Sequence, residues 1–389
     1  MESGRLGETA DVGGSPCFLV SLSLGLRWLL CCVALVTTGC PREAPRPTSS
    51  TKPRPSVALR VLVVNESELA ESINRLRGEW ADRSGSELTA VDKAWPEVTS
   101  QESLDADLIV FPSRYLGELY VRDWLQPIRA NVLESKELQA ADYFPLVRHE
   151  LISWGGQVIA LPLGVQLPIL SSENRIEPAI SLLTKAAPNA LSNERLGVLF
   201  DSETMKALIA QPPFVDALTE LTTAASNGKP GLQADDVTVP VLGYADRLIA
   251  VTASSRNAAS AFKLLEWLAL PETSTQLARV GQGTMPPRRS LASSAAWYDP
   301  TITARERTDI GENLEAALSR PDYLLIPRIP GVDDYMAALD QAVDDAISGG
   351  VSPQVALEKA SRRWDEITDT HGRESQRQAY LKHLGISDP

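Results

Sequence analysis

Short apolar runs alternate with segments of helical periodicity through the middle of the chain. Four strands are predicted, over residues 58–64, 87–92, 106–112 and 247–255. The first and third are apolar throughout and rich in β-branched residues, as in strands buried within a parallel sheet. Residues 69–80 carry apolar side chains three and four positions apart, and Ser84-Gly85 ends that predicted helix. The alternation predicts an α/β fold with a parallel sheet.

The loops after the predicted strands carry helix-start signals. Asn65 and Glu68 have the spacing of a capping box, and Ser113 has the position of an N-cap for a helix that runs through Tyr120. Asn65 and Ser113 are therefore interpreted first as helix caps and second as ligand contacts.

The last third of the chain is predicted to be helical. Residues 332–347 place apolar side chains on one stripe, and Gly349-Gly350 follows as a stop signal. Ser352-Pro353 then combines an N-cap with proline at the first helical position, and the next helix carries Trp364 on its apolar side. These stripes, and Trp80, Trp124 and Trp267 elsewhere, are predicted to form core.

A different pattern occupies the first forty residues. The apolar run over residues 28–38 is eleven residues long, follows Arg27, and ends in the small residues Thr37-Thr38-Gly39. A membrane-spanning helix needs about 20 apolar residues, whereas a signal-peptide core needs about 7–15. Residues 1–39 are therefore predicted to be an export signal. An ordinary secretion signal and a retained membrane anchor remain as alternatives.

All four cysteines lie in this segment, at positions 17, 31, 32 and 40. Small residues directly before Cys40 resemble the lipobox of bacterial lipoproteins, which implies lipidation of that thiol. Residues 40–56 hold five prolines and no large apolar side chain, so they are predicted to form an extended tether. The four basic side chains of this tether suit an anionic membrane surface.

Charge and motifs exclude several function classes. The chain is acidic, with a formal net charge of −13, whereas nucleic-acid binders need a basic face. No zinc-protease, redox-cysteine, hydrolase-elbow or phosphate-loop motif is present after the signal. We therefore expect no enzyme activity, no cofactor and no metal.

Four segments in order resemble family 1 of the bacterial extracellular solute-binding proteins, the receptors of sugar ABC importers. The segments begin "DADLIVFPSRYLGELYVRDWLQPI", "YFPLVRHELISWGGQVIALPLGV", "LIAVTASSRNAASAFKLLEWLALPE" and "PRIPGVDDYMAALDQAVDDAISGG". The resemblance implies a two-lobed, type II periplasmic-binding-protein-like fold whose discontinuous lobes are joined by a hinge. It assigns residues 57–163 and 248–319 to lobe 1, and residues 164–247 and 320–389 to lobe 2.

The second lobe departs from the family pattern. No aromatic residue lies between Trp154 and Phe200, where the family carries aromatic side chains that shape the sugar site. Two hypotheses therefore stay open. The chain is a lipid-anchored, monomeric receptor on the periplasmic side of a bacterial membrane that delivers a carbohydrate to an ABC permease, or it is a degenerate relative that binds a partner protein.

Candidate ligand contacts follow from the ends of the predicted strands, because ligands of such folds lie at strand carboxyl ends and helix N-termini. They are Glu66, Ser67, Ser113, Arg114, Tyr115, Gln166, Tyr244, Arg247 and Trp297. Packing on its own helix is the alternative for Tyr115. Trp297 and Tyr298 are interpreted as an exposed aromatic pair in a loop, with core as the alternative.

Overall fold

The computed structural model describes residues 57–167, 176–191, 197–228, 232, 238–278 and 284–386. The predicted export signal, Cys40 and the proline-rich tether lie outside these residues. Residues 53–389 form one compact unit. None of the described helices is both long and apolar enough to cross a bilayer.

A five-stranded mixed sheet organises the first region of the chain. Its strands are β1 (Ala58–Val64), β2 (Glu87–Lys93), β3 (Leu108–Pro112), β6 (Leu161–Gly164) and β8 (Arg247–Val251), in the order β2-β1-β3-β8-β6. β1 is parallel to β2 and β3, as predicted, but β8 runs antiparallel to both of its neighbours. The apolar runs identified the strands, whereas the direction of β8 depends on where the chain returns from the other region.

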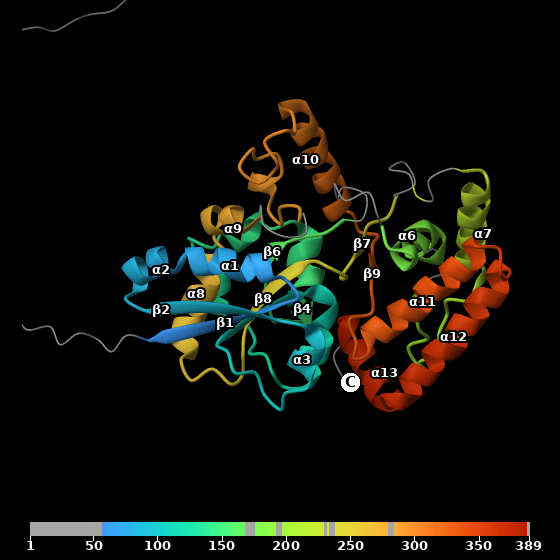
Figure 1. Cartoon of the computed structure of the whole chain (residues 1–389), viewed down its shortest axis with the longest axis horizontal. Helices are drawn as coiled ribbons and strands as arrows, with labels where there is room; N and C mark the ends of the chain where they lie inside the picture. Colours follow the sequence, from blue (N-terminus) through green and yellow to red (C-terminus); the bar gives the residue numbers. More distant parts are fainter. Residues whose placement is uncertain are drawn as a thin grey trace, which may run out of the picture. The chain divides into compact units, whose positions relative to one another are not determined.

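Helices and short turns surround this sheet. They are α1 (Ser67–Arg75), α2 (Arg77–Ser84), α3 (Trp95–Thr99), η1 (Ser113–Tyr115), α4 (Leu116–Val121), α5 (Ala130–Leu133), η2 (Ala140–Asp142), η3 (Val147–Leu151), α8 (Ala258–Leu268), α9 (Pro271–Ala278) and the hairpin β4–β5 (Ser153–Trp154, Gln157–Val158). Helices α1, α2 and α9 lie together over one face of the sheet (Figure 1). We call this sheet with its helices the sheet region.

The second region is mostly helical in the described part of the chain. It contains α6 (Pro178–Ala190), α7 (Pro212–Ser226), α11 (Val332–Ile347), α12 (Pro353–Thr370), α13 (Arg373–His383) and the two-residue parallel strands β7 (Val241–Leu242) and β9 (Leu324–Leu325). Helices α11 and α12 run side by side, as do α6 and α7 (Figure 1). Ser352 caps α12 through the backbone N–H of Val355, as predicted. We call these elements the helical region.

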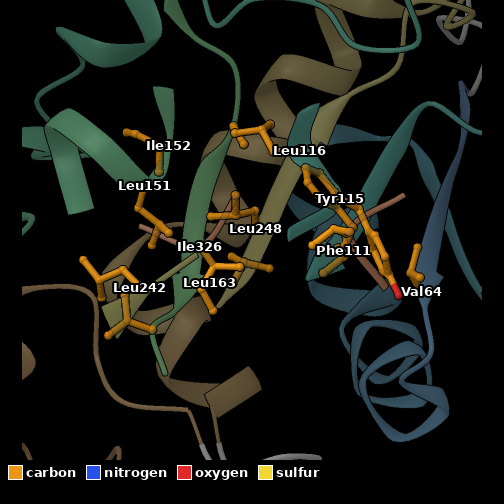
Figure 2. Close-up of a cluster of buried hydrophobic side chains, with 14 of the residues drawn as sticks. Val64, Phe111, Tyr115, Leu116, Leu151, Ile152, Leu163, Leu242, Leu248 and Ile326 are labelled. Atoms are coloured by element: carbon orange, nitrogen blue, oxygen red, sulfur yellow. The ribbon is translucent and has the colours of Figure 1, made fainter. Parts of the chain in front are cut away.

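One hydrophobic core extends through both regions. The predicted core tryptophans are all buried, with exposed fractions of 7% or less at Trp80, Trp124, Trp267 and Trp364. Figure 2 shows the part of this core where the chain crosses between regions: Leu163 and Leu248 from the sheet lie beside Leu242 and Ile326. The crossing segments therefore lie inside the packed interior.

Arg328 fastens one side of the junction between the regions. It lies between β9 and α11, is 1% exposed, and donates to the carbonyl oxygens of Leu151 (2.6 Å) and Ser153 (3.2 Å) in the sheet region. Its Nε donates to Nδ1 of His383 on α13 at 3.5 Å. Burial lowers the pKa of His383 well below its usual value, and the Arg328 charge lowers it further.

A tight backbone contact lies against the same arginine. Gly117, on α4, faces the Arg328 carbonyl and the buried ring of Trp154, and a Cβ at this position would overlap both. Glycine is therefore required by close approach of the two regions here.

Several local predictions are corrected by tertiary contacts. Asn65 does not cap α1: it adopts a φ of 58°, and its side-chain oxygen accepts from the N–H of Trp95 at 3.0 Å. The predicted helix over residues 69–80 is two helices, α1 and α2, that meet at Leu76. Ser113 begins the short turn η1 instead of capping a helix, because its hydroxyl is bound to Asp246.

The expected exposed aromatic pair is also wrong, because Trp297 and Tyr298 are 3% and 6% exposed. The Trp297 indole donates to the carbonyl oxygen of Thr284 at 2.7 Å, and the Tyr298 hydroxyl donates to that of Ala292. Trp297 and Tyr298 lie in the segment between η6 (Arg289–Leu291) and α10 (Ala304–Leu318), and both of their polar groups are satisfied there.

Candidate functional site

Four chain segments bring polar side chains to one edge of the five-stranded sheet. β1 and β3 end at this edge, and β8 begins there because it is antiparallel, with Arg247 opposite Pro112. β6 also ends at this edge, with Gly164 opposite Arg247. The loops that carry most of the candidate residues therefore converge, as the carboxyl ends of parallel strands do in ligand-binding α/β folds.

Asp246 is the hydrogen-bonding centre of this edge. Its side chain is fully buried and accepts from the Ser113 hydroxyl (2.8 Å) and from the backbone N–H groups of Gln166 and Gly243 (both 2.9 Å). Burial raises its pKa, and the three donors counteract that rise. One carboxyl group thus ties the loops after β3 and β6 to the turn before β8.

A buried ion pair lies next to this centre. Arg247 is 2% exposed, and its guanidinium contacts the Glu66 carboxylate at 2.8 Å. Burial raises the pKa of Glu66 more than the pairing with Arg247 lowers it. The Glu66 backbone N–H in turn donates to the side chain of Asp92, near the end of β2. The pair therefore fixes the loop after β1 against the start of β8.

Arg114 is a partly exposed residue of the edge. Its guanidinium lies 4.5 Å from the ring centre of Tyr115 and 4.7 Å from that of Tyr244, so it is held between two aromatic rings. It also donates to the Tyr244 carbonyl (3.2 Å) and to the Tyr115 hydroxyl (3.0 Å). Tyr115 is stacked on Trp95, with ring centres 3.8 Å apart. We call Arg114, Tyr115 and Tyr244 the arginine clamp.

The helical region supplies carboxylates to this clamp. Asp333, in the first turn of α11, accepts from Arg114 Nε (2.9 Å) and from the Tyr115 hydroxyl (2.7 Å). Glu177, directly before α6, shares a hydrogen bond with the Tyr244 hydroxyl. Burial lowers the pKa of Arg114, but Tyr115, Asp333 and Tyr244 together raise it above its usual value. Two helix N-termini therefore face the sheet edge.

The structure brings together seven of the nine candidate residues. Glu66, Ser113, Arg114, Tyr115, Gln166, Tyr244 and Arg247 all belong to the contacts just described. Ser67 is exposed at the first position of α1, beside Glu66. Trp297 is buried, and its indole N–H bond stays within its own segment, at Thr284. Ser113 and Arg247 are buried too, so they position the loops instead of presenting polar atoms to solvent.

Sequence reasoning missed Asp333, Glu177 and Trp95. Asp333 could have been found from the sequence, because it is an acidic residue in the first turn of a predicted helix, two positions after Gly331. Such a residue is a possible partner for a basic side chain such as Arg114. Trp95 had none, because its partner Tyr115 lies on a different strand-end loop. No cluster of metal-ligating side chains occurs among the residues that the structure describes.

Comparison with known proteins gives a likeness in structure alone. No protein-family model and no curated protein matches the chain. Among solved structures, the sugar-binding protein MalE from Xanthomonas citri superimposes with a TM-score of 0.59 at 16% identity, over 81% of this chain and 98% of that one. A cyclo/maltodextrin-binding protein complexed with maltotetraose gives 0.57 at 16% identity, over 80% and 97%.

A solute-binding protein of an ABC transporter from Thermotoga lettingae, bound with α-D-tagatose, gives a TM-score of 0.56 at 15% identity, over 80% of this chain and 100% of that one. The chain has the two-lobed fold of the solute-binding proteins. Ligands of open α/β folds lie at the carboxyl ends of the sheet strands. The arginine clamp and its carboxylate partners occupy that position here.

Proposed function

We propose that this chain is an extracytoplasmic solute-binding protein that captures a small carbohydrate between two lobes for an ABC importer. The observation that carries the proposal is the convergence of polar strand-end residues, from β1, β3, β6 and β8, against the N-termini of α6 and α11. Solute-binding folds bind ligands in the crevice at such an edge. The named neighbours with bound maltotetraose and tagatose support a sugar as the solute.

The mechanism follows from which residues each region contributes. Lobe 1, over residues 57–163 and 248–319, presents Glu66, Ser67 and the first two clamp residues. Lobe 2, over residues 164–247 and 320–389, presents Gln166, Tyr244 and the carboxylates of Asp333 and Glu177. Separation of the lobes breaks the contacts to Asp333, and closure around a solute brings polar groups of both lobes against the solute.

The N-terminal segment gives this receptor its location. We propose that residues 1–39 direct export, that Cys40 is lipidated, and that the proline-rich residues 40–56 hold the body away from the membrane. The anchored body then acts as a monomer beside the permease subunits. Metabolic labelling with an alkynyl fatty acid checks this: the wild-type chain incorporates the label, and Cys40→Ser does not.

A second candidate function is favoured because the polar side chains of the site already have partners within the protein. Arg114, Tyr115 and Tyr244 already bind protein groups, as does Asp246. A chain with this arrangement also suits a relative that no longer takes a solute and serves as a partner-binding lipoprotein.

A thermal-shift screen of the purified protein against mono- and oligosaccharides separates the two candidates. A ligand that binds only the folded state stabilises it by about 2.7 kcal/mol at a hundredfold excess over its Kd. We expect a saturable shift with one sugar class, lost in Tyr244→Ala and kept in Tyr120→Ala, which removes an equally half-buried tyrosine away from the edge. A folded protein that ignores every sugar supports the partner-binding lipoprotein.

A further inference from the structure

The arginine clamp has the donor set of a carboxylate-binding site. Arg114 Nε and the Tyr115 hydroxyl bind the two different oxygens of one carboxylate, at 2.9 and 2.7 Å. Two donors on separate oxygens give the directional, charge-assisted recognition that carboxylates receive from arginine in proteins. The carboxylate bound here belongs to the protein itself, at Asp333.

Asp333 is not needed to hold this donor set in place. The guanidinium is fixed by the Tyr244 carbonyl and the Tyr115 hydroxyl, and the Tyr115 ring is fixed by its stack on Trp95. These contacts leave the Arg114 Nε–H free to donate a charge-assisted hydrogen bond to Asp333. The clamp therefore keeps its geometry if the carboxylate leaves.

Among the residues that the structure describes, the other carboxyl groups of the edge form no ion pair with Arg114. The Glu66 carboxylate is paired with Arg247, and the Asp246 carboxyl group is held by three hydrogen-bond donors. Asp333 is the residue that contacts the Arg114 charge directly, through an ion pair of 2.9 Å. An anionic group of a solute can therefore take the place of Asp333 as the charge partner of Arg114.

Asp333 is the more replaceable partner of this ion pair. Its side chain is 49% exposed, whereas that of Arg114 is 15% exposed. It also stands on α11 in the helical region, whereas Arg114 belongs to η1 in the sheet region, so a movement of α11 takes the carboxylate away from Arg114. A half-exposed ion pair contributes little to stability, about 0–1 kcal/mol, which a ligand can readily exceed.

We propose that the arginine clamp is a subsite for the carboxylate of the solute, and that Asp333 occupies it when no solute is bound. The solute class is then an acidic sugar, such as a uronic acid. This inference rests on the proposed function and narrows it. A neutral sugar binds this subsite poorly, because it leaves a guanidinium without a counter-charge in a half-buried site.

The test is calorimetric titration of the purified full chain with matched sugars at constant ionic strength. D-galacturonate is compared with D-galactose, and D-glucuronate with D-glucose, since each pair differs only by a carboxylate in place of a hydroxymethyl group. We expect at least one acid to bind tenfold or more tightly than its neutral counterpart. Equal affinity within both pairs overturns the inference and leaves the sugar receptor intact.

Two variants test the role of Asp333 and Arg114 separately. Asp333→Ala removes the internal competitor, and we expect it to tighten binding of the acidic sugar by about fivefold or more. Asp334→Ala is the matched control, because it removes the same charge from the next, exposed residue of the same helix turn. Weaker or unchanged binding in Asp333→Ala relative to Asp334→Ala contradicts displacement.

Arg114→Gln is expected to abolish the preference for the acid and to leave weak binding of both sugars. Arg122→Gln is its control, since Arg122 also lies over an aromatic ring, that of Trp124, and pairs with Glu118 on α4. If none of the four sugars binds to the wild-type chain or to Asp333→Ala, the inference fails, whereas the sugar-binding function fails only if the full thermal-shift panel is also negative.

Discussion

The sheet and helical regions touch through two arginines that work in opposite ways. Arg328 is 1% exposed, and it binds backbone carbonyls of η3 and β4 together with His383 of α13. Arg114 is partly exposed, and it binds a half-exposed carboxylate at the start of α11. In the first contact, a buried arginine side chain of the helical region binds backbone carbonyls of the sheet region. In the second, two partly exposed side chains form one ion pair.

The difference indicates which side of the junction can open. Breaking the hydrogen bonds between Arg328 and the backbone carbonyls leaves buried polar groups without these partners, which costs free energy. Separation of Arg114 from Asp333 exposes both charges to water, which costs about 0–1 kcal/mol. We infer that the Arg328 side acts as the pivot and that the Arg114 side is the mouth of the site.

The largest effect is expected from removing the pivot. Arg328→Met leaves the Leu151 and Ser153 carbonyls unsatisfied in the interior, so we expect a loss of about 3–5 kcal/mol in the free energy of unfolding. Urea denaturation measures it. Arg363→Met, which removes an exposed arginine paired with Glu366, serves as the control and should change stability by less than about 0.5 kcal/mol. A loss below about 1 kcal/mol at Arg328 would contradict the pivot.

A second change tests the close approach at the same place. Gly117→Ala forces a methyl group onto the Arg328 carbonyl and the Trp154 ring, and overpacking of this kind costs about 2–3 kcal/mol. Gly78→Ala has the opposite expected sign, because this exposed glycine of α2 has open space around it and alanine favours helix by about 0.5–1 kcal/mol. Thermal unfolding of the two variants gives the comparison.

Acidification should weaken the pivot through His383. The folded state keeps this imidazole neutral, since its pKa is well below the usual value, whereas the unfolded chain takes up a proton near pH 6.5. The free energy of unfolding therefore keeps its full value above about pH 6.5. At lower pH it decreases by up to about 1.4 kcal/mol per pH unit. Urea denaturation at pH 7.5 and 5.5 measures this fall.

His383→Gln isolates this contribution, because its stability should depend less on pH than that of the wild type. The buried carboxyl groups of Glu66, Asp246 and Asp340 have raised pKa values and act in the opposite direction, but they are common to both proteins and cancel in the difference. His149→Gln, at an exposed position, controls for loss of a histidine. Parallel pH profiles for wild type and His383→Gln would exclude the effect.

The smallest effect on stability is expected at the mouth. Asp333→Ala breaks a half-exposed ion pair and should lower the free energy of unfolding by at most about 1 kcal/mol, while Asp334→Ala should change it less. The informative measurement is small-angle scattering, in which Asp333→Ala should expand relative to Asp334→Ala. Identical radii of gyration would show that the ion pair does not hold the mouth closed.

Much of the sheet region could be predicted because its signals are local. The apolar runs gave β1 with its observed bounds and located β2, β3 and β8. The stripe of α11 and the cap at Ser352 were equally readable. The antiparallel direction of β8 was not, since it depends on a path through the other region.

The candidate site was only partly predictable, for a related reason. The strand-end loops pointed to Arg114, Tyr115 and Tyr244, which the structure brings together, but the contacts of these side chains depend on partners more than 100 residues apart, such as Arg114 with Asp333. Arg328 was missed because a single arginine in "PRIPG" has no periodic signal. Trp297 was misjudged because its loop position concealed a buried indole whose N–H has a backbone partner.

The packing of α13 against the hairpin β4–β5 also affects the order in which the chain folds. The Gly155 N–H donates to the Lys382 carbonyl at 3.0 Å, and His383 meets Arg328, so the hairpin β4–β5 is completed by a helix that follows it by more than 200 residues. Such distant pairings form slowly, since a long loop must close first. The hairpin β4–β5 therefore reaches its final packing only after α13 has been synthesised, and Trp154 lacks its contact with His383 until then.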